Sequence, residues 1–352
     1  MRTTQSNPNP ARGVHVVAIG GGTGLSTLLR GLKKHVVALS SPGPPPVAPL
    51  VTRLTAIVTV TDDGGSSGKL REEQGVPAPG DIRNCMTALS DDEELLSQLF
   101  CYRFSGGGLD GHSFGNLFLT ALAGVRGDFA QAVQLSSAIL KTRGDIFPSS
   151  ACSDVQLEAL MRDGKRVRGE TKISATAGGI SRLSLVPPDV CPLPQSIDAI
   201  ADADIITIGP GSLFTSCIPN VLVNGVPDAI RSSRALRVYI GNLMTQPNES
   251  TGLTASQHIA AIFDHAGGKL FDYALLNSAP VPQALRARYA EDNSEPLVND
   301  LDAIRALGVT PILGDYLDAS QFARHAADRI AADLLNLPDR LQQESAAQAR
   351  KA

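Results

Sequence analysis

The side chains most suggestive of chemistry lie in a glycine-rich stretch near the start of the chain. An apolar, partly β-branched run over residues 14–19 is followed by five small residues, Gly20, Gly21, Gly22, Thr23 and Gly24. Leucines at helical spacing come next, so the pattern predicts a strand, a turn and the start of a helix. Glycines let the backbone approach a ligand closely, and a helix N-terminus carries the positive end of the helix dipole. The stretch therefore favours a phosphate or diphosphate ligand.

Neither of two common nucleotide-binding motifs fits this stretch. In G-x-G-x-x-G the third glycine would fall at Leu25 or at Thr27, and no Gly-Lys-Ser/Thr closes a P-loop. A glycine-rich turn that binds nothing is the alternative interpretation.

A second candidate stretch follows the next predicted strand. It carries two adjacent carboxylates and several phosphate-type donors, namely Asp62, Asp63, Ser66, Ser67, Lys69 and Arg71. Acids at the carboxyl end of a strand can bind ribose hydroxyls or a magnesium ion. The alternative is a solvated acidic turn, which Asp-Gly also favours.

A third group of polar residues opens an apolar helix at His112, Ser113 and Asn116. His112 is a candidate general base, but the sequence assigns it no partner acid. Ser113 has the residue type of a helix N-cap, so plain capping is the simpler interpretation.

A second glycine turn appears late in the chain, after a predicted strand over residues 204–209. Gly209, Gly211 and Ser212 lead into another helix start, and Asn242, Thr245 and Gln246 follow the next strand. Two such turns in one sheet indicate two ends of one extended ligand, or two ligands that meet. The neutral side chains suit a sugar or a base edge, although a polar loop explains them too. The sequence places no histidine near Ser66, Ser67 or Ser212, so acyl transfer is disfavoured.

These candidates must be positioned by alternating strands and helices. We expect strands over residues 14–19, 54–61, 181–186, 204–209, 236–241, 271–276 and 309–313, with another over 170–174. We expect helices over residues 24–35, 91–103, 114–124, 128–140, 153–162, 212–224, 255–266 and 319–336. Strands that are apolar almost throughout indicate burial on both faces. The pattern predicts an α/β fold, a three-layer α/β/α Rossmann-like architecture with a mainly parallel sheet.

Composition narrows the class of protein. The 352 residues are 43% hydrophobic and 19% charged, with a net charge of −4 and no tryptophan. This balance disfavours a dedicated nucleic-acid binder. No apolar run is long enough for a membrane span, and the polar N-terminus lacks a secretory signal, so we expect a cytoplasmic protein. Five scattered cysteines without C-x-x-C, and histidines without metal spacing, argue against disulfides and zinc.

The predicted organisation is one domain with two tails. Residues 1–12 are expected to be a disordered tail, and residues 13–337 a single α/β domain with a Pro-rich insertion at 40–49. Residues 338–352 are expected to be a polar C-terminal tail or a fraying helix.

Taken together, the motifs resemble those of the YvcK family, which is related to 2-phospho-L-lactate transferase (CofD). The resemblance covers about residues 14–316 and rests on six motifs in order: AIGGGTGLSTLLRGLK, VTVTDDGGSSGKLR, PGDIRNC, GHSFGNLFLTAL, GPGSLFTSCIPNVLV and GNLMTQP. It implies a CofD-like Rossmann fold, a cytoplasmic location and a UDP-sugar ligand such as UDP-N-acetylglucosamine. It also implies a role as a gluconeogenesis factor, in growth on gluconeogenic carbon sources, cell shape and cell-wall synthesis.

The resemblance also implies roles for particular residues. Residues 20–24 would hold the diphosphate, Asp62 and Asp63 would lie beside the nucleotide, and residues 209–212 would close the far side. Tyr273 resembles a position of the family's C-terminal pattern and is a candidate base or sugar contact, with a core tyrosine as the alternative. The Pro-rich insertion and the segment GVTPILGDYLDASQF depart from the family's pattern.

Three functions compete at this point. The leading hypothesis is a regulatory protein that binds a UDP-sugar or another nucleotide diphosphate, with no catalytic residue and no certain cofactor. The rival is a CofD-like transferase, which moves a phospholactyl group from a guanine dinucleotide-like donor to a deazaflavin alcohol with magnesium. A nicotinamide-dependent oxidoreductase is the weakest, because the dinucleotide fingerprint is incomplete. A homodimer and contacts with cell-wall synthesis proteins are further expectations.

Overall fold

The structure is a computed structural model that describes residues 13–37, 50–91 and 95–349. The predicted N-terminal tail at 1–12 and the Pro-rich insertion at 40–49 therefore lie outside the described residues. Within the described ranges, none of the helices combines the length and the apolar character that crossing a membrane requires.

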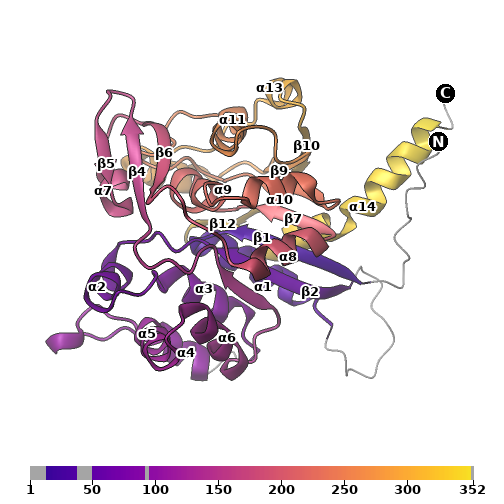
Figure 1. The fold of residues 1–352 in the computed structure, drawn as a ribbon. Helices are drawn as coiled ribbons and strands as arrows, with labels where there is room; N and C mark the ends of the chain where they lie inside the picture. Colours follow the sequence, from indigo (N-terminus) through magenta and orange to yellow (C-terminus); the bar gives the residue numbers. More distant parts are fainter. Residues whose placement is uncertain (1–12, 38–49, 92–94, 350–352) are drawn as a thin grey trace.

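A seven-stranded parallel sheet forms the centre of the molecule (Figure 1). The strands are β1 (Val14–Gly20), β2 (Val51–Val58), β3 (Asp145–Pro148), β7 (Ile205–Ile208), β8 (Leu236–Ile240), β9 (Tyr273–Asn277) and β10 (Thr310–Gly314). Their order is β10-β9-β8-β7-β1-β2-β3. The chain builds outward from β1 on one side and from β7 on the other, so the strand order reverses between these two strands. The sheet confirms the predicted mainly parallel α/β fold.

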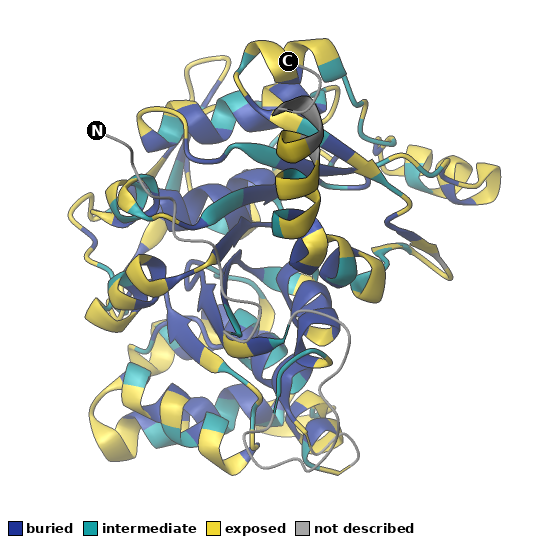
Figure 2. Cartoon of the chain, turned by 90° about the vertical axis from the view of Figure 1, so that its right-hand side faces the viewer, coloured by how far each residue is buried: buried dark blue, intermediate teal, exposed yellow. Residues whose placement is uncertain are grey.

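Alternate side chains of β1 enter two separate cores. Val17 and Ile19 belong to the core on one face of the sheet, and Val16 and Ala18 to the core on the other. All four are fully buried, which explains the continuous apolar run in the sequence. Buried residues fill the sheet, while exposed residues occupy the outward faces of the helices (Figure 2). The predicted three layers follow from this arrangement.

Different helices cover the two faces. The Val16 face packs against α1 (Gly22–Lys33), α3 (Gly80–Leu89), α4 (Leu95–Cys101), α5 (Phe114–Arg126), α6 (Phe129–Ile139) and α14 (Ala327–Ala349). The Val17 face packs against α7 (Glu170–Ala175), α8 (Pro194–Asp202), α9 (Ile218–Val221), α10 (Val226–Ser232), α11 (Ala255–Ala266) and α13 (Leu301–Ala306). The described residues also form α2 (Gly65–Gln74), α12 (Gln283–Glu291) and a 3-10 turn at Gly107–Leu109.

A small antiparallel sheet replaces a helix predicted at residues 153–162. Its strands are β4 (Gln156–Met161), β5 (Arg166–Arg168) and β6 (Ile180–Val186), in the order β5-β4-β6. The prediction was wrong because Leu157, Ala159 and Met161 alternate with more exposed residues, which is the period of a strand. Their high helix propensity yields here to pairing with β6.

Three further boundaries differ from the prediction. Residues 170–174 were expected as a strand but lie in helix α7, and residues 212–224 divide into a π-turn at Leu213–Cys217 and the short α9. The helix expected over 319–336 begins only at Ala327, because a hairpin of β11 (Leu317–Ala319) and β12 (Ala323–His325) precedes it. Residues 338–349, predicted as a tail or a fraying helix, are the second half of α14.

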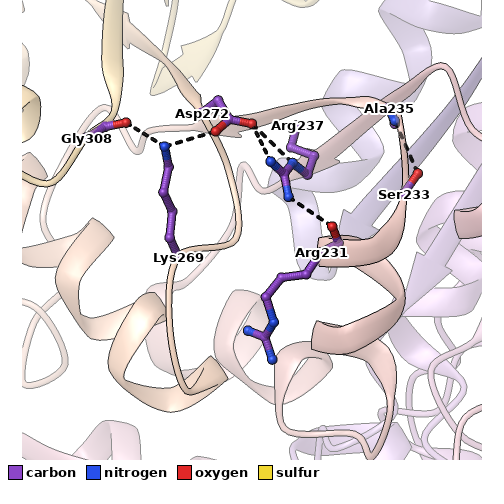
Figure 3. A network of polar contacts seen from close by, with 7 residues as sticks. All are labelled: Arg231, Ser233, Ala235, Arg237, Lys269, Asp272 and Gly308. Carbon is purple, nitrogen blue, oxygen red and sulfur yellow. Dashed lines mark hydrogen bonds and ion pairs between the residues drawn. The ribbon is translucent and has the colours of Figure 1, made fainter. Parts of the chain in front are cut away.

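A polar network braces the amino ends of β8 and β9 (Figure 3). Arg237 donates from Nη2 to Asp272 Oδ2 at 2.7 Å and from Nε to the same oxygen at 3.1 Å. Lys269 Nζ lies 2.9 Å from Asp272 Oδ1 and donates to the Gly308 carbonyl at 2.7 Å. These ion pairs stabilise the edge of the sheet opposite the glycine turns.

Candidate functional site

The first glycine turn connects β1 directly to α1. Gly21 is the N-cap of α1, and no side chain caps the helix there. Gly22 has φ +63°, a left-handed conformation that glycine adopts without strain. The Gly20 carbonyl accepts hydrogen bonds from the Thr59 N–H at 2.9 Å and from Asn220 Nδ2 at 3.1 Å. The turn is thus fixed to β2 and α9. The Gly22 N–H donates a hydrogen bond to Asp81, and the N–H groups that follow it in the first turn of α1 have no partner within the helix.

The second glycine turn lies against the first. A Cβ atom on Gly24 would lie 2.5 Å from the Pro210 carbonyl oxygen, and one on Gly211 would lie 3.2 Å from the Gly21 carbonyl oxygen. Only glycine permits this approach of two backbones. The structure therefore brings together the two stretches of small residues at 20–24 and 209–212, 185 or more positions apart, where the strand order reverses.

A cleft of about 440 Å³ opens between these turns and the segments that follow β8 and α12. It is lined by both turns and by Ser216, residues 242–247, Tyr289, Asp292, Ser294, Ala323 and His325. Ligands of open α/β sheets bind at such a position, beyond the carboxyl ends of the strands at the point of reversal.

Gln246 fixes the geometry of the second turn. Its Nε2 donates to Ser212 Oγ, and its Oε1 accepts from the Leu213 N–H at 3.2 Å. Thr245 is buried, and its Oγ1 accepts from the Glu295 N–H at 3.0 Å. The predicted neutral side chains therefore shape the wall of the cleft, and Asn242 lines it beside them.

His325 is a cleft residue that the sequence analysis missed. It lies on β12, and its Nε2 is 3.0 Å from the Gly241 carbonyl, so Nε2 carries the proton. Burial lowers the pKa of His325 to about 4, and the imidazole is therefore neutral at pH 7 with Nδ1 as an acceptor. The residue follows the segment that departs from the family's pattern, and only the β11–β12 hairpin reveals its position.

The carboxylates of Asp62 and Asp63 in the second loop have different hydrogen-bond partners. Asp62 Oδ1 accepts from the Gly64 N–H at 2.9 Å, whereas Asp63 Oδ1 accepts from the N–H of Thr171 at 2.8 Å and from its hydroxyl at 2.6 Å. Asp63 is thus committed to the start of α7. Asp62 and Asp63 do not fit as a joint magnesium site, and the described residues contain no group of three or more potential metal ligands.

Asp62 is instead electrostatically coupled to Asp81, on the first turn of α3. Burial, together with the charge of Asp62, raises the pKa of Asp81 to about 6, and the Gly22 N–H partly offsets this rise. A Cβ on Gly21 would lie 2.7 Å from Asp81 Oδ2, so the carboxyl is directly behind the first glycine turn. The sequence shows Asp81 only as part of the PGDIRNC motif.

Two further acids surround this pair. Burial and the charges of Asp62 and Asp81 raise the pKa of Glu170 well above its usual range, and burial raises the pKa of Glu249. Oε2 of each glutamate lacks a hydrogen-bond partner in the described part of the chain. These four residues make this region acidic, whereas the described lining of the cleft includes a single acid, Asp292.

The remaining predicted residues form a separate group around α2 and α5. Ser66 Oγ lies 3.2 Å from His112 Nδ1, and Lys69 Nζ donates to the Asp110 carbonyl at 3.4 Å. Ser113 caps α5 by accepting from the Asn116 N–H at 3.2 Å, the structural role that was the simpler interpretation. Ser67 and Asn116 are buried nearby. None of these residues lines the 440 Å³ cleft.

Tyr273 and Arg71 lie apart from the cleft. Tyr273 begins β9, so it is at the amino end of the sheet, opposite the glycine turns, and packs against the Val16-face core. Arg71 donates to the carbonyls of Thr61, Asp62 and Val155, and thereby ties the second loop to β4.

Comparisons with known proteins agree on one family. The model of the family described as 2-phospho-L-lactate transferase CofD matches residues 16–317. The gluconeogenesis factor of Halalkalibacterium halodurans is 45% identical over 324 residues, covering 91% of this chain and 95% of the relative. That of Bacillus subtilis is 42% identical over 324 residues, covering 92% and 97%. The crystal structure of protein BH3568 from Bacillus halodurans matches with a TM-score of 0.86 and 44% identity, over 92% of this chain and 100% of that chain.

Proposed function

The chain belongs to the family of 2-phospho-L-lactate transferase CofD, and we propose that within this family it is a regulatory gluconeogenesis factor that binds a nucleotide-sugar. Its membership confirms the resemblance predicted from the six motifs. The relatives named gluconeogenesis factor, which match over nearly their whole length, support the physiological part of the proposal. We extend it to UDP-sugars such as UDP-N-acetylglucosamine, to a cytoplasmic location and to control of cell shape and cell-wall synthesis.

One observation supports the ligand class above all. Two glycine turns from β1 and β7 meet at the point of strand reversal, and the cleft between them leads to neutral polar side chains. Backbone N–H groups at a helix start suit the diphosphate, and the amide and hydroxyl groups beyond suit a sugar or a base. Among the described residues that line the cleft, no hydroxyl is hydrogen-bonded to a histidine, and the Ser66–His112 pair lies outside it. This favours binding over catalysis in the cleft.

A thermal-shift panel tests this proposal. The panel contains UDP-N-acetylglucosamine, GDP, GTP and NAD, each with and without Mg²⁺. A ligand at one hundred times its dissociation constant stabilises the protein by about 2.7 kcal/mol. We expect this stabilisation with the UDP-sugar; preference for a guanine nucleotide with Mg²⁺, and no response to UDP-sugars, would contradict the proposal.

A pair of glycine variants tests the position of the diphosphate. Gly22 and Gly75 have φ of +63° and +64°, and a Cβ has space at both. Gly22→Ala and Gly75→Ala therefore carry a similar strain of roughly 1–2 kcal/mol. Gly22 lines the cleft and Gly75 ends α2, so we expect only Gly22→Ala to lose UDP-sugar affinity, by tenfold or more. Equal affinities in the two variants would exclude the first turn as the phosphate site.

A CofD-like transferase remains the second candidate, because Asp62 and Asp81 are coupled behind the first turn. Magnesium is commonly held by one or two carboxylates together with the phosphates of a substrate. In that case Asp62→Ala would abolish any dependence of binding on Mg²⁺, whereas a pure binding protein would show only weaker affinity. The homodimer and the contacts with cell-wall synthesis proteins stay predictions.

A further inference from the structure

A smaller cavity of about 220 Å³ lies beyond the carboxyl ends of β8 and β9. It shares Asn242 and Leu243 with the larger cleft, so a ligand held at the glycine turns can extend into it. Neighbouring strands are ~4.8 Å apart, which places this cavity about 12 Å along the sheet from β1. An extended ribose diphosphate can bridge that span.

Some polar groups of the small cavity are hydrogen-bonded to other described residues, and some are available to a ligand. Both polar atoms of the Asn277 amide have partners, because Nδ2 donates to the Ala279 carbonyl at 2.8 Å and Oδ1 accepts from the Tyr316 N–H at 3.0 Å. Asn299 Nδ2 donates to the Asn277 carbonyl at 2.7 Å, which leaves Asn299 Oδ1 as an acceptor.

Two further residues supply hydrogen-bond donors to the cavity. Arg286 and Asn242 line the cavity, and neither side chain has a hydrogen bond or an ion pair with another described residue. The cavity therefore presents a guanidinium, a complete amide and one additional amide oxygen, all without a competing partner among those residues.

The rest of the cavity lining is apolar. Leu243 and Val281 are each 6% exposed, and Leu297 lies with them among the lining residues. A lining that combines apolar side chains with a few polar groups suits a flat ring better than a hexose, whose hydroxyls point outward all around it. The imide edge of a uracil-type base has one N–H and two carbonyl oxygens, and these groups complement one acceptor and two donors.

We infer that the small cavity binds the base of the nucleotide-sugar, and that this base carries a pyrimidine imide. Its N–H donates to Asn299 Oδ1, and its carbonyl oxygens accept from Arg286 and from Asn242. The inference rests on the proposed function and assigns the nucleoside to the β8–β9 side. The usual Rossmann arrangement uses the acid after β2 for the ribose, but here Asp63 is engaged with Thr171.

Calorimetric titration of three variants tests this assignment. Arg286→Gln removes the free cation, Val281→Phe fills the cavity, and Arg234→Gln is the control. Arg234 is likewise an exposed arginine, but it precedes β8 at the opposite edge of the sheet. The probes are UDP, GDP and inorganic pyrophosphate, the last of which carries no base and reports on the phosphate site alone.

We expect wild type and Arg234→Gln to bind UDP more tightly than GDP. Arg286→Gln and Val281→Phe should each weaken UDP by about tenfold or more, as expected for a lost hydrogen bond to a charged group, and should reduce the preference over GDP. Pyrophosphate affinity should be unchanged in both. Arg286 is exposed, so its variant folds even if Val281→Phe does not.

The possible results distinguish a failure of the proposed function from a failure of the base assignment. If wild type binds neither UDP nor UDP-N-acetylglucosamine, the proposed function and this inference both fail. If wild type binds UDP and Arg286→Gln binds it equally well, the base lies elsewhere while the proposed function stands. If Arg286→Gln loses pyrophosphate in step with UDP, the arginine serves the phosphates and the base assignment is wrong.

Discussion

At the scale of single residues, the most telling feature is an acid directly behind the first glycine turn. Asp81 is close to the N–H groups that we assign to a phosphate, and its pKa is raised to about 6 by burial and by Asp62. An ionised carboxyl at this position is unfavourable in the unliganded protein. We infer that stability is given up here for function, as is common where binding sites gather like charges.

Asp81→Asn should therefore stabilise the unliganded protein at pH 7. Because the folded-state pKa of about 6 exceeds the ordinary 3.8, the stability that neutral Asp81 provides is complete below pH 3.8 and is lost as the pH rises through 6. The gain in the free energy of unfolding should reach about 3 kcal/mol at pH 7 and vanish toward pH 4. Urea denaturation at both pH values measures it, with the exposed Asp198→Asn as control. An equal gain at pH 4 and pH 7 would show that the charge of Asp81 is not its cause.

Some candidate site residues could be predicted from the sequence and others could not. Residues 20–24 and 209–212 were predicted as candidates because glycines after an apolar run produce a local signal. Ser113 was identified as a cap because its effect is confined to one turn of helix. Asp81 and His325 were missed as site residues, because only long-range packing brings them to the turn and the cleft.

At the scale of elements, the C-terminal helix α14 has two halves with different roles. Ile330, Leu334 and Leu335 are buried in the core beside α1. A Cβ on Gly31 of α1 would lie 2.3 Å from the Ala327 carbonyl oxygen, so the two helices are in close contact. After Pro338 the helix continues with largely exposed residues. Only the first half is needed to cover the sheet.

Two variants distinguish the halves of α14. Leu334→Ala should lower the free energy of unfolding by about 2–5 kcal/mol, because it leaves a cavity in the core. Ending the chain after Gln343 should change it by less than about 0.5 kcal/mol, since surface changes rarely exceed that value. Denaturant unfolding of both proteins measures the difference. A truncation as costly as Leu334→Ala would assign the last turns of α14 a structural role.

Helices and strands were predictable where the hydrophobic pattern of their own residues was strong. The leucines of α1 and the apolar run of β1 specify their own structure. By contrast, Leu157, Ala159 and Met161 have good helix propensity, and the antiparallel partner that makes them a strand follows about 20 residues later. The β11–β12 hairpin was hidden in the same way, because its strands are three residues each.

At the scale of the whole molecule, the strand order of the parallel sheet determines where the candidate binding surface lies. Reversal between β1 and β7 leaves a gap that two glycine turns line, and the following strands carry neutral polar groups along the same edge. The acidic region lies on the β2 side and the two cavities extend over the β8 side. A ligand that is anionic in its middle and neutral at its ends suits this distribution of charge.

A crystal structure of the protein with UDP-N-acetylglucosamine would locate the ligand. We predict the diphosphate between the two glycine turns, within hydrogen-bond distance of the backbone N–H groups that open α1, with the rest of the ligand along residues 242–247. A nucleotide-sugar bound outside this cleft, with the two turns free of phosphate, would refute the proposed site.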